Sequence, residues 1–213
     1  MKKFLENYWY HYKWPTIIII SSILVSIICL VQCTKKDEYD MYVLYAGPVY
    51  IGGEQSKALT DAINDHMTPD KQKVCINNFV YVSEEMKNNY REGDAYYNDG
   101  INQQQKKDFF DFLYTASFNM LIVDSELYRS ISVDEILLPL TEISESMSLK
   151  SEDGYCINLY DTTLPEKYAI FAQMPENTVL CFRKRVLMQD LASKTNEQTY
   201  EYHKSIFKKI IES

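Results

Sequence analysis

Glycine, histidine and basic residues are scarce in this sequence. Its 213 residues include six glycines and three histidines, and 22 Lys and Arg stand against 30 Asp and Glu, which gives a formal net charge of -8. Six glycines beside eighteen tyrosines exclude collagen-like, Gly-rich and low-complexity chains. Because phosphate binding needs clustered Lys and Arg, the acidic balance argues against nucleic acid as a partner.

The sequence also lacks common catalytic and metal-binding motifs. GxSxG, HExxH, the P-loop and paired CxxC motifs are absent. His11, His66 and His203 are scattered along the chain, and a lone histidine on an apolar face is typical of core packing. The acidic stretch Asp94–Asp99 lacks the spacing of an EF-hand. We therefore predict that the protein is not an enzyme and holds neither cofactor nor metal.

A long apolar run lies near the N-terminus. Residues 16–33 carry no charge, and as a helix rising 1.5 Å per residue they just match a hydrocarbon core of about 30 Å. The aromatic segment Tyr8–Trp14, which holds both tryptophans, precedes the run and suits the headgroup level. These features predict a single transmembrane helix between a short tail, residues 1–15, and a charged linker, residues 34–40.

The basic residues around this segment favour a cytoplasmic N-terminus. Lys2, Lys3 and Lys13 precede the span, whereas Lys35 and Lys36 follow it. The remaining chain, residues 41–213, carries the acidic excess and has enough apolar residues for a core. We therefore expect an extracellular domain anchored to the plasma membrane by one span.

Two alternatives to a retained anchor stay open. A cleaved signal peptide needs small residues at its cleavage site, and Leu30-Val31-Gln32 offers none. A lipoprotein signal ends at a cysteine, and Leu30-Val31-Gln32-Cys33 matches a lipobox at its first two positions but departs from it at Gln32. Lipidation of Cys33 is therefore the second alternative.

Strand and helix patterns alternate through the domain. Apolar, β-branched or aromatic runs predict strands over residues 41–47, 73–83, 118–124, 155–161 and 178–182. Helical spacing predicts helices over residues 52–66, 103–117, 125–131, 133–143 and 197–213. Polar stretches over residues 84–100 and 144–154 predict loops. This alternation indicates an α/β fold, with a mostly parallel sheet and helices on both faces.

Several stretches of the domain occur in an order known from one protein family. They are the first strand and helix, the helix and strand over Asp108–Asp124, the segment Ile136-Leu137-Leu138-Pro139-Leu140, and the strand Val179–Phe182 with the closing helix. Together they resemble lobe one of the type 2 periplasmic solute-binding proteins, in the form that occurs on the outer face of Gram-positive bacterial cells. Residues 144–154 stand where a second lobe would be inserted and are far too short to contain it. The resemblance therefore implies a single-lobe relative.

The same resemblance suggests where a ligand binds. In an open parallel sheet, ligands meet the carboxyl ends of the strands where the strand order reverses, and the family order places this point between the first and third strands. The adjoining loops supply the candidate ligand-binding residues Gly52, Gly53, Gln55, Ser56, Asp124 and Ser125. Backbone amides at the Gly-Gly helix start could face an anion, and Asp124 could bind an amine. Gly-Gly before a helix is usually only a turn, however, and Asp at a helix start is usually only a cap.

Three cysteines fall in predicted strands of the domain. They are Cys75, Cys156 and Cys181. An odd number leaves at least one unpaired, and cysteines at strand centres commonly serve as small buried apolar residues. A disulfide among the three is an alternative, and the sequence does not choose the pair.

Two functions remain open from the sequence. The first is a membrane-anchored extracytoplasmic binding module that senses or presents a small solute. The second is a ligand-free scaffolding or interaction domain that docks to another membrane or envelope protein. A pocket at Gly52, Gly53, Ser56 and Asp124 would favour the first, and a flat apolar or tyrosine-rich patch would favour the second.

Overall fold

A computed structural model gives the fold of the chain. It describes residues 2–34, 39–67, 73–87, 97–115, 118–185 and 197–212, with the side chains of residues 8–10 and 12–29 in the first helix. Contacts within the chain divide it into two compact units, Met1–Glu38 and Tyr39–Ser213. The second unit holds the sheet.

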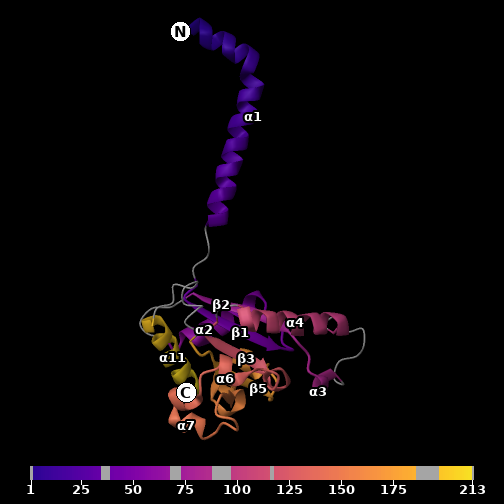
Figure 1. Ribbon diagram of the computed structural model, residues 1–213, viewed down its shortest axis with the longest axis vertical. Coiled ribbons are helices and arrows are strands. Elements are labelled where there is room, and N and C mark those ends of the chain that lie inside the picture. Colours follow the sequence, from indigo (N-terminus) through magenta and orange to yellow (C-terminus); the bar gives the residue numbers. More distant parts are fainter. Residues whose placement is uncertain are drawn as a thin grey trace. The chain divides into compact units, whose positions relative to one another are not determined.

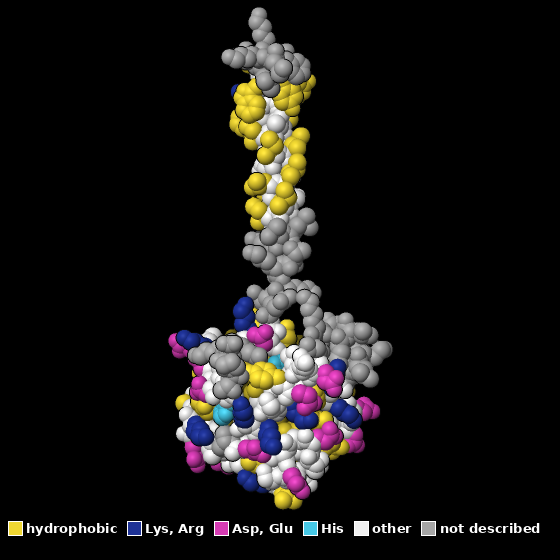
Figure 2. Space-filling model, turned by 90° about the vertical axis from the view of Figure 1, so that its left-hand side faces the viewer, with side chains coloured by type: hydrophobic (Ala, Val, Ile, Leu, Met, Phe, Trp, Pro, Cys, Tyr) yellow, Lys and Arg dark blue, Asp and Glu magenta, His cyan; other side chains and the backbone are white. Residues whose placement is uncertain are grey.

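The first unit contains one long helix, α1 (Lys2–Thr34; Figure 1). Its stretch Tyr12–Cys29 has a mean hydropathy of 1.7, is long and apolar enough to cross a membrane, and is not buried within the structure. Apolar side chains cover the described part of this helix in Figure 2. Ser26 Oγ donates to the Ser22 carbonyl at 2.9 Å, so this hydroxyl is satisfied within the helix. Such a helix is compatible with a single-pass anchor or a signal sequence. The side chain of Cys33 lies outside the described residues.

The second unit is built on a five-stranded sheet. Its strands are β1 (Met41–Gly47), β2 (Val74–Val80), β3 (Met120–Asp124), β4 (Cys156–Asn158) and β5 (Thr178–Phe182). They lie in the order β2-β1-β3-β5-β4. Because β1 pairs in parallel with both β2 and β3, the strand order reverses between the first and third strands.

The sheet is mixed, which corrects part of the prediction. β5 runs antiparallel to β3 and to β4, while the β2-β1-β3 part is parallel. All five residues of β5 are buried. A strand buried on both faces is apolar throughout in either direction, so its sequence does not reveal which way it runs.

Hydrophobic clusters cover both faces of the sheet. The first face, which carries Val43 and Leu180, packs against α2 (Gly53–Asn64), α7 (Glu145–Ser148), α8 (Leu164–Lys167), α9 (Ala169–Ala172) and α11 (Glu197–Glu212). The second face, which carries Leu44 and Cys181, packs against α4 (Asp99–Thr115), α5 (Ser125–Tyr128) and α6 (Val133–Ile136). Figure 1 shows how these helices surround the strands. The predicted arrangement of helices on both faces is therefore confirmed.

The remaining short helices stand mostly where loops or longer elements were predicted. They are α3 (Glu84–Lys87), η1 (Leu140–Glu142) and η2 (Leu159–Asp161). The predicted helix over residues 133–143 ends at Ile136, because Leu137 forms a β-bridge with Arg183 and Pro139 follows. Residues 88–96 of the predicted loop lie outside the described part of the chain.

Candidate functional site

A cavity of about 430 Å³ lies on the second face of the sheet, beside β4 and β5. Its apolar floor comes from Tyr128, Cys156 and Val179, which belong to the core of that face or pack against it. Its other lining residues are polar or charged: Ser125, Arg129, Lys150, Ser151, Glu152, Asp153, Asn158, Asp161 and Asn177.

Strand register brings three of these residues, Ser125, Asn158 and Asn177, to the same end of the strands. Asp124 pairs with Thr178, and Asn158 pairs with Val179. Ser125 follows β3, Asn177 precedes β5 and Asn158 ends β4, so all three stand at the carboxyl end of β3 and β4. The Ser125 amide donates to the Asn177 carbonyl at 3.0 Å, which ties the two walls together. The cavity therefore lies at the carboxyl end of β3 on its β4 side, whereas the prediction placed a ligand between β1 and β3.

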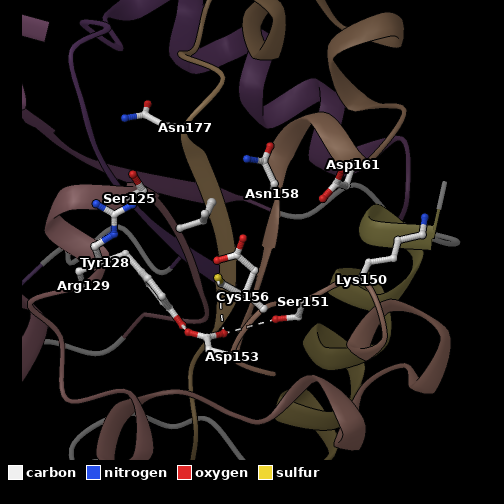
Figure 3. A pocket seen from close by; sticks show the side chains of 12 residues that line it. Ser125, Tyr128, Arg129, Lys150, Ser151, Asp153, Cys156, Asn158, Asp161 and Asn177 are labelled. Carbon is white, nitrogen blue, oxygen red and sulfur yellow. Dashed lines mark hydrogen bonds between the residues drawn. The ribbon is translucent and has the colours of Figure 1, made fainter. Parts of the chain in front are cut away.

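Asp153 is held in place at one side of the cavity. It accepts hydrogen bonds from the Tyr128 hydroxyl, from the Tyr155 amide at 2.9 Å and from Ser151 Oγ at 3.3 Å. Figure 3 shows Tyr128, Ser151 and Cys156 converging on this carboxylate. Burial opposes its ionisation, but the hydrogen bonds from Tyr128 and the backbone outweigh burial and lower the pKa of Asp153. Burial and the bond to Asp153 raise the pKa of Tyr128. Asp153 is thus a fixed anion at neutral pH.

Charged groups of both signs surround the cavity. Arg129 and Lys150 stand on opposite sides in Figure 3, with Asp161 nearer Lys150. Within the described part of the chain, neither Arg129 nor Lys150 forms an ion pair with a carboxylate. These cationic groups are available to an anionic ligand group, and Glu152 and Asp161 add negative charge to the same lining.

Of the predicted site residues, Ser125 lines the cavity, and Asp124 directly precedes Ser125 in the sequence without lining the cavity. Asp124 is 1% exposed and caps α5, accepting from the Glu126 amide at 2.8 Å and from Asn177 Nδ2 at 3.0 Å. Burial raises the pKa of Asp124, and these two hydrogen bonds partly offset the effect. The structural role of Asp124 is therefore that of a cap.

The four other predicted site residues lie at the start of α2. None of Gly52, Gly53, Gln55 and Ser56 lines the cavity, and α2 packs on the opposite, first face. Gly52 is the N-cap in extended conformation, and its carbonyl accepts from the Ser56 amide at 2.6 Å. A Cβ at Gly52 would lie 2.6 Å from the Tyr50 ring, whereas Gly53 faces open space. Because the Tyr50 side chain is 62% exposed and can turn aside, this contact alone does not require glycine at position 52.

Sequence reasoning missed the lining that comes from residues 150–158. These residues were interpreted as a polar connection followed by a strand. The available signal was the mixture of charge in Lys150, Glu152 and Asp153 directly before Gly154, which adopts a positive φ of 82°. Glycine accepts this conformation without strain, and the resulting turn directs Asp153 back toward Tyr128.

Within the described ranges, no group of three or more His, Cys, Asp or Glu side chains is placed to hold a metal ion. Comparisons of this chain with models of protein families, with curated proteins and with solved structures find no match.

Proposed function

We propose that the protein is a membrane-anchored binding module that takes a small polar solute carrying groups of both charges. In this proposal α1 is a retained anchor with its N-terminus in the cytoplasm of a Gram-positive bacterium. The sheet domain then lies outside the cell and senses or presents the solute. Its partners are the plasma membrane and that solute.

The cavity beside β4 and β5 is the observation that carries this proposal. Its volume of about 430 Å³ lies within the range of roughly 300–1,000 Å³ typical of small-molecule sites. An apolar floor with a few convergent polar groups is also typical of such sites. Arg129 and Lys150 suit a carboxylate or other anion, while Asp153 and Asp161 suit an amine. A zwitterion the size of an amino acid satisfies both sets.

The topology supports the finer proposal of a reduced lobe of a type 2 solute-binding protein. β1 lies between β2 and β3, and the later strand β5 returns beside β3. The cavity is formed by one domain alone, so binding does not require a second lobe.

A docking domain is the alternative, and the observed surface favours it less. In the described part of the domain, the exposed large apolar side chains come from α4, which carries Ile101 and Tyr114, and from four other places in the sequence: Tyr39, Tyr50, Leu149 and Tyr160. The face seen in Figure 2 intersperses acidic and basic side chains. Docking surfaces are commonly contiguous apolar patches, whereas the apolar side chains on this face of the domain are scattered among charged ones.

A thermal-shift screen of the Tyr39–Ser213 unit tests solute binding. The library holds amino acids, short peptides, sugars and oxyanions. A ligand at a hundred times its Kd stabilises a protein by about 2.7 kcal/mol, which at about 2–4 °C per kcal/mol is a shift of several degrees. We expect zwitterions to give that shift, and we expect Arg129→Ala and Lys150→Ala to reduce it.

The matched control is Lys107→Ala, which removes an exposed charge of α4 away from the cavity lining and should leave the shift unchanged. A library without any hit contradicts solute binding. A hit that both cavity variants retain in full contradicts the location of the site.

Protease protection tests the anchor separately. In intact cells expressing the full chain, we expect externally added protease to digest the domain while the protein sediments with membranes. A domain that stays protected until the cells are lysed would contradict the proposed orientation. Release of the protein into the medium would indicate that the N-terminal helix is removed.

A further inference from the structure

The structure distinguishes among the three cysteines of the domain. Cys156 on β4 and Cys181 on β5 are direct partners in the antiparallel register. Cys75 lies on β2, which β1 and β3 separate from β5. With neighbouring strands about 4.8 Å apart, that separation is roughly 14 Å, twice the reach of about 7 Å between Cα atoms in a disulfide. Cys75 is therefore too distant to pair with either of the others.

The geometry of Cys156 and Cys181 suits a covalent bond. Residues directly opposite in an antiparallel pair have Cα atoms about 4.5 or 5.5 Å apart, and both values fall within the disulfide range of about 4.4–6.8 Å. Their side chains project from the same face of the sheet. Accordingly, Cys181 belongs to the core of the second face, and Cys156 packs against that core. Both thiols are free in this structure.

We propose that Cys156 and Cys181 form a redox pair that closes to a cross-strand disulfide by exchange with a small dialkyl disulfide. Cys156 is part of the floor of the cavity, and the disulfide joins the edge strand β4 to β5. It stands on strand register alone and does not depend on whether the cavity binds a solute.

The two thiols have different roles in the exchange. Cys156 is half-buried and lines the cavity, so a small disulfide from solvent can reach it. Cys181 has no exposed surface, and burial raises the pKa of its thiol, so it does not react first. Cys156 Sγ, as the thiolate, attacks one sulfur of the small disulfide and releases one small thiolate. This step leaves a mixed disulfide on Cys156.

The protein disulfide then closes in a second exchange step. Cys181 Sγ attacks the Cys156 sulfur of the mixed disulfide, and the second small thiolate leaves. The protons of the two protein thiols end on the two released small thiols. The balance is one protein dithiol and one small disulfide consumed, and one protein disulfide and two small thiols formed. No other oxidant is required.

Closure changes the cavity as well as the strand pair. The Cys156 thiol now lies 3.7 Å from Asp153 Oδ1 and acts as a weak donor to it. In the disulfide this donor is lost, while Tyr128 and the Tyr155 amide still hold the carboxylate. The edge strand β4, which is three residues long, becomes covalently fixed to its neighbour.

Peptide mapping of the full chain in detergent tests the pair. The protein is reduced, equilibrated with oxidised glutathione, quenched with acid, alkylated in denaturant and digested without reduction. We expect a cross-linked species that joins the Cys156 and Cys181 peptides, with Cys75 still alkylated. Renewed reduction should return both peptides to the alkylated form.

Variants separate this pair from other linkages. Cys75→Ser should give the same cross-link, whereas Cys156→Ser should leave Cys181 alkylated, because no accessible thiol starts the exchange. The proposal is overturned if wild-type Cys156 stops at a stable glutathione adduct. It is also overturned if Cys75 enters the cross-link. A third contrary result is that Cys156 and Cys181 are both still free thiols, and so are alkylated, after conditions that oxidise a small-molecule dithiol.

Discussion

The His203 imidazole lies in the core of the first face. It has no exposed surface, and neither ring nitrogen has a hydrogen-bond partner in the structure. Burial lowers the pKa of His203 to about 4, while Asp40 exerts a smaller opposing effect. The folded chain therefore holds a neutral imidazole at pH 7. The unfolded chain, with a pKa near 6.5, takes up a proton as the pH falls.

This difference predicts that the domain loses stability in mild acid. The folded pKa lies below the unfolded one, so the contribution of His203 is present above pH 6.5 and is lost as the pH falls toward 4. The loss is on the order of 3 kcal/mol. Urea unfolding of the wild-type domain and His203→Leu at pH 7 and pH 4.5 measures it. We expect the free energy of unfolding to fall less between pH 7 and pH 4.5 in the variant than in the wild type. Equal falls would show that protonation of His203 does not cause the loss of stability.

Asp124 is a second residue whose role can be measured. Asp124→Ala removes the cap of α5 and leaves the Glu126 amide and Asn177 Nδ2 without their acceptor. We expect a loss of about 1–3 kcal/mol in the free energy of unfolding at pH 7. Ser132, the N-cap of α6, makes no cap hydrogen bond, so Ser132→Ala should cost less than about 0.5 kcal/mol. Equal losses in the two variants would mean that the cap of α5 contributes little.

At the scale of elements, α11 shows how tightly one helix depends on its apolar face. Ile206 has no exposed surface in the core of the first face, whereas Lys209 on the same helix is exposed. We expect Ile206→Ala to lower the free energy of unfolding by about 2–5 kcal/mol, because it removes buried methyl groups and leaves a cavity. Lys209→Ala should change it by less than about 0.5 kcal/mol. Chemical unfolding measures both, and a small effect at Ile206 would contradict the packing described here.

The elements differ in how far their sequences predict them. The helix α11 begins at the predicted residue, and β1 and β5 have the predicted bounds, because their apolar patterns are regular and have clear ends. The helices α8 and α9 were missed because four residues are too few to show helical periodicity. The direction of β5 depends on strand pairing, which a single apolar run does not encode.

The candidate site was only partly predictable for a related reason. The carboxyl end of β3 follows from the order of the strands, and Ser125, which lines the cavity, stands there. The cavity itself forms where β4 lies beside β5, and its lining includes the turn before β4. Charged residues such as Lys150 and Asp153 have the composition of a solvated loop. Strand pairing and the positive φ at Gly154 bring them to the cavity, and neither is visible in a short sequence window.

At the scale of the whole molecule, the chain joins an apolar helix to a folded domain that has a cavity beside β4 and β5. The apolar stretch of α1 is not buried within the structure and is compatible with a membrane span or a signal sequence. The sheet unit has its own hydrophobic core on each face. The cavity lies entirely within this unit, so solute binding can be measured on it without a membrane.

The most direct test of the binding proposal is an NMR titration of the isotope-labelled Tyr39–Ser213 unit with the same library of solutes. For at least one zwitterion, we predict saturable shifts of the amide signals of Ser125, Arg129, Asp153 and Asn177, with the signals of Gly53 and Gln55 unchanged. Saturable shifts confined to the start of α2, or none at the cavity across the library, would contradict the account.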